Sequence, residues 1–185
     1  MKDIMNLTKK VALGVAVGFF SNFAFAQTLQ EGVANADSHK YAKAKTVFNE
    51  MIAKSPSAEN YFYLGNSYLT QFEPNFELAQ ENFNKGLVAD KKSYLNRIGL
   101  ASVKLGKGDK SAIAEIQNIV KDSRDKDAEV LYRAAEALTI FGGAANADLA
   151  IDLLNRAVEK SQKGGTSASY YYTLGDAYRL TLTNS

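Results

Sequence analysis

The sequence predicts an all-α fold built from repeated pairs of antiparallel helices. Three observations support this prediction. The stretch YFYLGNSYL at 61–69 returns as YYTLGDAYRL at 171–180. No segment shows the alternation of apolar and polar residues that a half-buried strand needs. Small residues recur in one register, with spacings of 33, 34, 36 and 40 residues, at Gly32, Gly65, Gly99, Ala135 and Gly175.

A second pattern follows each of the first four small residues. It is an alanine, then three residues, then a large apolar side chain. Two residues four positions apart lie on the same face of a helix, so each pair marks a second amphipathic helix behind the first. The pairs are Ala44 with Phe48, Ala79 with Phe83, Ala112 with Ile116, and Ala150 with Leu154.

The first 26 residues have the composition of a secretory signal peptide. Three lysines precede the apolar run VALGVAVGFF, and Ala24 and Ala26 supply the small residues that signal peptidase requires before its cleavage site. We expect cleavage after Ala26, which leaves a domain over 27–185. The alternative, a membrane anchor, is less favoured because Ser21 and Asn22 end the apolar run before the roughly 20 residues of a spanning helix.

The apolar periodicity then predicts nine helices in succession. Proline and glycine separate them: Pro56 and Pro74 in the first half, and glycine pairs in the later turns. The predicted ranges are 28–38, 40–54, 58–71, 75–89, 92–106, 109–122, 126–141, 146–162 and 167–182.

This pattern resembles the tetratricopeptide repeat (TPR) family, whose signature is W, two residues, LG, two residues, Y, then A, three residues, F, then P. The second unit matches best, with Leu64, Gly65, Tyr68, Ala79 and Phe83. The departures are the missing tryptophan in every unit, a serine for the tyrosine of the third unit and an alanine for the glycine of the fourth. The resemblance implies a TPR-type α-solenoid of about four full repeats plus the first helix of a fifth.

In that family the small residue lies where the two helices of a unit press together. We therefore expect all five small residues to be packing positions. The last predicted helix, 167–182, is a first helix without its second. Because a solenoid normally covers its terminal apolar face, we expect that the natural protein continues past Ser185 or that another molecule covers this face.

Composition argues against several functions. Removing the leader takes three lysines and one aspartate from 22 basic and 20 acidic residues, which leaves 19 of each. A chain with balanced and interspersed charges has no electrostatic signature for nucleic acid or anionic lipid. The chain has no cysteine, so a lipid-anchored cysteine is excluded and export adds no disulfide.

No catalytic or metal site is predicted. His39, the one histidine, lies in a turn without partners for acid-base chemistry or for a metal, and the carboxylates of 122–127 alternate with basic residues. The stretch GKGDKS at 106–111 lacks the spacing of a phosphate loop. We expect no enzyme activity and no cofactor.

The resemblance implies a concave groove lined by the first helices, which would bind a peptide or a protein segment. Three aromatic residues, Phe62, Tyr132 and Tyr172, share one register, three residues before the small one. The alternative is that these rings pack against the adjacent unit. The absence of a lysine at the Phe62 position argues against a clamp for a terminal carboxylate, and the acidic residues Glu136 and Asp176 indicate a neutral or slightly basic partner. The groove would consist of Phe62, Asn66, Leu69, Asn96, Leu100, Tyr132, Glu136, Tyr172 and Asp176.

These observations together predict a non-catalytic protein-interaction scaffold, exported to the periplasm or cell envelope, with no transmembrane segment after leader removal. Two alternatives stay open. One is a module that self-associates into a homo-oligomer through its uncapped C-terminal edge. The other is the N-terminal repeat region of a larger envelope protein whose activity lies further along the chain.

Overall fold

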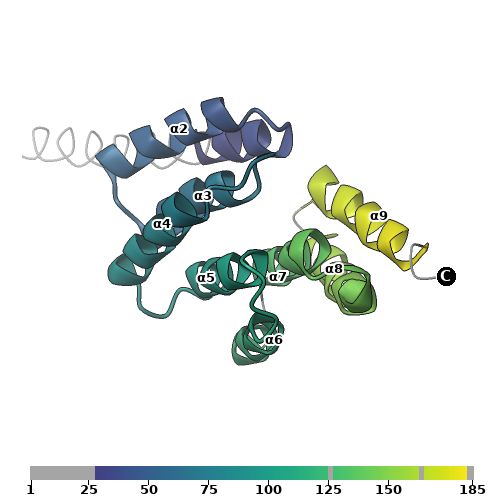
Figure 1. Ribbon diagram of the computed structural model, residues 1–185. Helices are drawn as coiled ribbons and strands as arrows, with labels where there is room; N and C mark the ends of the chain where they lie inside the picture. The colour runs from purple at the N-terminus through teal and green to yellow at the C-terminus, as the bar shows by residue number, and fades with distance from the viewer. Residues whose placement is uncertain (1–27, 125–126, 163–164, 183–185) are drawn as a thin grey trace, which may run out of the picture. The chain divides into compact units, whose positions relative to one another are not determined.

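The computed structural model describes residues 28–124, 127–162 and 165–182 (Figure 1). The expected signal peptide and its cleavage site lie outside this range. Within it every regular element is a helix, and no strand occurs. None of the described helices combines the length and the apolarity that crossing a membrane requires.

The chain divides into two compact units, Met1–Ser55 and Pro56–Ser185. In the first unit, residues 28–37 are helical and pair with α2 (Tyr41–Lys54). Phe48 of α2 is fully buried against the backbone of Gly32, where an added Cβ would lie 2.5 Å from the Phe48 ring. This contact is the predicted role of the glycine, since any side chain there would separate the two helices.

The second unit holds the remaining described helices. Several helices begin where a polar side chain accepts a hydrogen bond from the first turn, as Ser57, Asn75, Ser93 and Asp127 do. The elements are α3 (Ala58–Leu69), α4 (Phe76–Ala89), α5 (Tyr94–Gly106), α6 (Ala112–Asp122), α7 (Ala128–Phe141), the short 3₁₀ helix η1 (Ala144–Asn146), α8 (Ala147–Ser161) and α9 (Ala168–Leu182).

Hydrogen bonds between helix starts fix the direction of these elements. Asn96, near the start of α5, donates from Nδ2 to the carbonyl of Ala58 at the start of α3, 2.8 Å away. The hydroxyls of Tyr63 and Tyr170, both early in their helices, donate to Glu129 at the start of α7. The first helices of the pairs, α3, α5, α7 and α9, therefore run parallel, and the second helices α4, α6 and α8 return between them (Figure 1).

The predicted small residues shape the core of this unit. Phe83 of α4 is fully buried, and an added Cβ at either Gly65 or Gly99 would lie within 2.6 Å of its ring. The ring thus fills the space that the two glycines leave between α3, α4 and α5. Ala135 of α7 is also fully buried in a larger cluster that spans α5 to α9. The chain has the all-α fold of helix pairs expected of a TPR-type α-solenoid.

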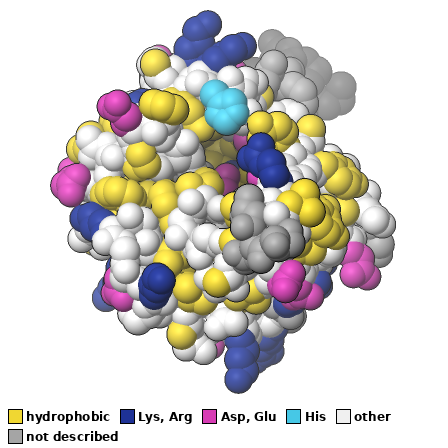
Figure 2. All heavy atoms as spheres, turned by 45° about the vertical axis from the view of Figure 1, so that its right-hand side comes forward, with side chains coloured by type: hydrophobic (Ala, Val, Ile, Leu, Met, Phe, Trp, Pro, Cys, Tyr) yellow, Lys and Arg dark blue, Asp and Glu magenta, His cyan; other side chains and the backbone are white. Residues whose placement is uncertain are grey.

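Gly175 is the exception to the packing prediction. It is exposed, and an added Cβ would meet no atom within 4 Å. The physical reason is that no described helix pairs with α9 as α4 pairs with α3. Figure 2, in which the right-hand side of Figure 1 comes forward, shows hydrophobic side chains at the surface of this side.

Candidate protein-binding surface

The first helices of the second unit surround a small cleft. Side chains of α3, α5 and α7 form its walls, among them Asn66, Ile98, Arg133, Glu136 and Ile140. Its volume is ≈ 10 Å³, close to the least that holds one water molecule. A partner can therefore contact the mouth of this cleft but cannot place a side chain inside it.

Four of the predicted groove residues are core residues instead. Phe62 lies 5.8 Å from Phe83, ring centroid to ring centroid, and Leu69 belongs to the same cluster. Asn96 is fully buried by the hydrogen bond that ties α5 to α3. Tyr132 stacks on Tyr170 with centroids 4.2 Å apart. The alternative hypothesis, packing against the adjacent unit, describes Tyr132, whereas the ring of Phe62 packs against the second helix of its own pair.

Three other predicted residues do meet at the cleft or near it. Asn66 donates from Nδ2 to Glu136 Oε2 at 3.4 Å, across α3 and α7. The hydroxyl of Tyr132 donates to the other oxygen of the same carboxylate at 3.2 Å. Leu100 is half-buried against the cluster of Phe62 and Phe83. Asn66 and Glu136 are therefore the predicted residues that reach solvent in the walls of the cleft, and Leu100 lies on α5 outside those walls.

The last two predicted residues lie on α9. Tyr172 is exposed, and Asp176 forms an ion pair with Arg179 of the same helix at 2.9 Å. Both keep the register of the residues around the cleft, whose walls come from α3, α5 and α7. They extend the candidate surface along α9 without joining the cleft itself.

Arg133 is the centre of the surface and was not predicted. Its side chain is 7% exposed, and its guanidinium pairs with Glu129 Oε1 at 2.8 Å and with Glu136 Oε2 at 3.0 Å. The guanidinium carbon also lies over the ring of Tyr132, 4.7 Å from its centroid. Phe62 and Tyr63 of α3 approach the same guanidinium at 5.8 and 5.7 Å.

Burial and the neighbouring charges set the protonation of this cluster. Burial opposes the charge on Arg133, but Glu129 and Glu136 outweigh it and raise the pKa of the guanidinium well above its usual value. Burial, followed by Glu129, raises the pKa of the Tyr63 and Tyr170 hydroxyls. These hydroxyls therefore stay protonated and act as hydrogen-bond donors to the carboxylate.

Three acidic residues, Glu59, Asp127 and Glu129, lie beside the ion pairs of Arg133 and are called here the acidic rim. Glu59 lies in the first turn of α3 and Asp127 caps α7, and the charges of Asp127 and Glu129 both act on the Glu59 carboxylate. Desolvation, then the charges of Glu129 and Asp127, raises the pKa of Glu59 above its usual value. Burial is the larger cause, and the two neighbouring carboxylates add to it, so negative charge gathers where α3 and α7 begin.

The arrangement can bind but offers no evident chemistry. Two carboxylates, those of Glu129 and Glu136, pair with the guanidinium of Arg133, and the charges of Glu129 and Asp127 also act on the carboxylate of Glu59. The described residues contain no group of three or more His, Asp or Glu side chains placed to hold a metal ion. The surface presents hydrogen-bond acceptors and negative charge around half-buried apolar side chains, which suits a cationic segment of a partner.

One sequence signal could have identified this cluster. Arg133 is the sole cation in the apolar helix AEVLYRAAEALTIF, with Glu129 four residues before it and Glu136 three residues after it. That spacing puts all three on one face, which is the face that packs against α3. The contacts from Tyr63 and Tyr170 could not be foreseen, because they come from helices 66 and 41 residues distant in the chain.

No protein-family model matches the chain, and no curated protein matches its sequence. Solved structures do resemble it. The TPR protein YrrB, described as having an unusual peptide-binding site, has a TM-score of 0.44 and 19% identity over 82% of this chain and 75% of its own. A MamA crystal structure has a TM-score of 0.44 and 18% identity over 84% and 81%. MamA from AMB-1 has a TM-score of 0.43 and 14% identity over 85% and 82%.

Proposed function

We propose that this chain is an exported, non-catalytic scaffold that binds a protein or peptide segment on the face formed by its first helices. The observation that carries the proposal is the group of acidic residues at the helix starts, beside the ion pairs of Arg133. Because Glu59, Asp127 and Glu129 gather at the helix starts beside half-buried apolar side chains, the favoured occupant is a basic segment with at least one apolar residue.

The proposed contacts follow from exposure. Asn66 and Glu136 are partly exposed in the walls of the cleft, and Ile140 is half exposed there. Leu100 is half-buried on α5, and Tyr172 extends the surface on α9. Arg133 has a supporting role, since it holds Glu129 and Glu136 in place and is itself buried. Phe62 belongs to the core, so its substitution would report on stability instead of binding.

Fluorescence anisotropy with two labelled peptides tests this function. One peptide alternates lysine with leucine, and the other replaces each lysine by glutamate. We expect the basic peptide alone to bind, with an affinity that falls as salt is added, because exposed charges are screened. The variant Glu59→Gln removes one carboxylate of the rim and should weaken binding severalfold.

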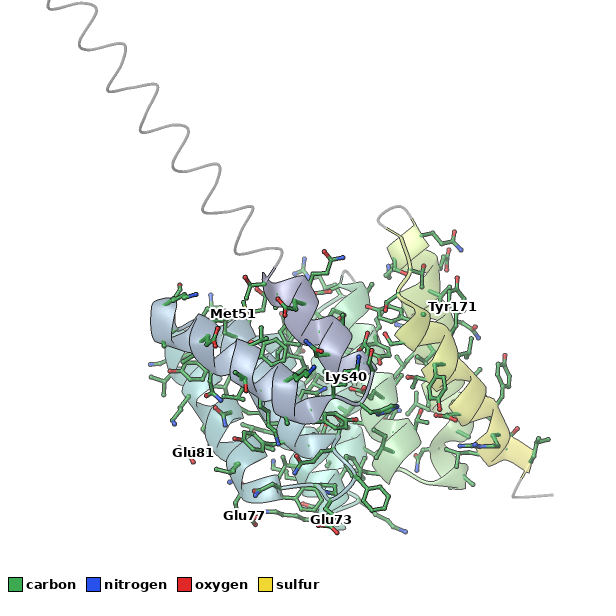
Figure 3. The ribbon with its side chains drawn as sticks, turned by 90° about the horizontal axis from the view of Figure 1, so that it is seen from above. Lys40, Met51, Glu73, Glu77, Glu81 and Tyr171 are labelled. Atoms are coloured by element: carbon green, nitrogen blue, oxygen red, sulfur yellow. The ribbon has the colours of Figure 1, made fainter. Side chains whose placement is uncertain are left out.

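Glu73→Gln provides the matched control. Glu73 lies in the loop between α3 and α4 (Figure 3), so its substitution changes the net charge equally without touching the rim. Equal affinity for the two peptides, or equal weakening by the two variants, would contradict the proposed role of the acidic rim.

Export is tested separately. We expect protein recovered from the periplasm of a bacterial host to begin at Gln27, as measured by intact mass. Its pI should also be lower than that of the full chain, since three lysines leave with the leader. Recovery only from the cytoplasm with residues 1–26 retained would overturn this part of the proposal.

A further inference from the structure

One stripe of apolar side chains on α9 is left uncovered. At helical spacing, Tyr171, Gly175, Tyr178 and Leu182 share one face of the helix, called here the α9 stripe. The three large side chains are 53%, 50% and 74% exposed, and nothing lies within 4 Å of a Cβ added at Gly175. Figure 3 labels Tyr171 on α9, at the edge of the ribbon.

The same register is covered on the other first helices. On α7 the equivalent residues are Leu131, Ala135 and Leu138, and each is 0% exposed. On α3, Tyr61 and Tyr68 are half-buried around Gly65, which is buried against Phe83 of α4. The α9 stripe therefore continues an interface that the fold already builds, with the covering helix missing from the described chain.

The sequence of α9 repeats that of α3 around the central glycine, although a Cβ added at Gly175 would meet no atom within 4 Å. Both helices carry tyrosines four residues before and three residues after the central glycine. A glycine inside an exposed helix costs about 1 kcal/mol relative to alanine, and Gly175 gains no contact in return. A glycine at this position becomes useful only when a second helix approaches closely.

Charge complementarity indicates the direction in which a covering helix would run along α9. The covering helices α4, α6 and α8 each carry an acidic residue in the first turn. In the pair α5–α6, this residue is Glu115, and it pairs at 2.7 Å with Lys104 in the last turn of α5. On α9, Arg179 occupies the last turn and is largely exposed. It is placed to pair with an acidic first turn of an antiparallel helix.

We propose that the α9 stripe binds an amphipathic helix of a partner protein, antiparallel to α9. This helix presents a large apolar side chain, best a phenylalanine, to Gly175 and an acidic first turn to Arg179. Phe83 of α4 shows the fit, since its ring lies directly on Gly65. The site lies on a different face of α9 from Asp176 and is separate from the surface around Arg133.

The chain itself supplies the probe, a synthetic peptide of residues 73–90 that contains α4. Backbone amide shifts of the ¹⁵N-labelled protein are followed as this peptide is added, because NMR detects the weak binding expected of a single short helix. We expect shifts that map to α9. A peptide with Phe83→Ala should bind at least tenfold more weakly, and the protein variant Gly175→Leu should lose the response.

Two controls keep the result interpretable. Gly175 faces open space, so Gly175→Leu should fold normally by circular dichroism and should still bind the basic peptide at the Arg133 surface. Tyr172→Ala changes an exposed side chain of α9 off the stripe and should bind the α4 peptide as the wild type does. A protein that fails to bind the α4 peptide but still binds the basic peptide would therefore contradict this inference alone and leave the proposed function intact.

Three outcomes would overturn the inference. Shifts could map to α3 and leave α9 unchanged, which indicates exchange with the native α4. The Phe83→Ala peptide could bind as well as the original, which removes the role of the glycine. Sedimentation could show a dimer that Gly175→Leu converts to a monomer, which would assign the stripe to a second copy of this chain.

Discussion

Replacing Gly65 by alanine tests the packing of the whole second unit with a single methyl group. An added Cβ would lie 2.6 Å from Cε1 and 2.8 Å from Cδ1 of Phe83. Carbon atoms in contact are about 3.5–4.0 Å apart, so the ring would have to move by roughly 1 Å. Gly99 of α5 also lies against this ring, with an added Cβ 2.5 Å from the same Cε1, so the ring is packed between two helices.

The expected loss follows from two opposing effects. Overpacking a close-packed core costs about 1–3 kcal/mol, and the confinement of Phe83 from both sides puts Gly65→Ala in the upper part of that range. Alanine recovers about 1 kcal/mol through its better helix propensity. The net loss of unfolding free energy is about 1–2 kcal/mol, or a fall in Tm of about 2–8 °C for a chain of this size.

Gly175→Ala is the matched control, because it makes the same change in the same register without a neighbour. It should raise Tm by about 2–4 °C, since only the gain of helix propensity remains. Thermal unfolding followed by circular dichroism at 222 nm measures both variants. The reasoning fails if Gly65→Ala is as stable as the wild type, or if both variants shift Tm in the same direction.

Three further predictions concern the charged and polar contacts. Arg133→Ala leaves two carboxylates unpaired and should cost about 3–5 kcal/mol in urea unfolding, whereas Arg97→Ala, in a surface pair, should cost less than about 1 kcal/mol. Asn96→Ala removes a buried interhelical hydrogen bond and should cost about 1–3 kcal/mol by the same assay. The pKa of Glu59 is raised in the folded state, so ionisation of this carboxyl lowers stability as the pH rises above its unfolded value of 4.5. Glu59→Gln should raise Tm at pH 7, and this gain should vanish well below pH 4.5, where both states of the wild type are protonated.

Much of the fold was predictable because helix pairs follow from local periodicity. The predicted ranges agree with the described helices to within about three residues, as for 58–71 against Ala58–Leu69. The alanine and large apolar pairs also mark real second helices, since Ala79 and Phe83 are both fully buried. These features depend on residues close together in the chain, so one sequence is enough to reveal them.

The residues of the candidate surface were less predictable, because the exposure of a side chain depends on which helices lie beside it. Phe62, Tyr132 and Tyr172 occupy the same register, yet the first two are buried and the third is exposed. The difference is what lies beside each helix: α4 and α7 cover Phe62, and α9 covers Tyr132. No pattern within a single helix contains that information.

By itself, the sequence determined the helices, their pairing and the positions where only a small residue fits, because a 34-residue period and the i, i+4 spacing are local properties of the chain. Only the tertiary structure decided which of the small residues lie against a side chain of a neighbouring helix. Phe83 closes on Gly65 and Gly99, Glu129 and Glu136 enclose Arg133, and Gly175 faces open space, since each outcome depends on a helix supplied from elsewhere in the chain.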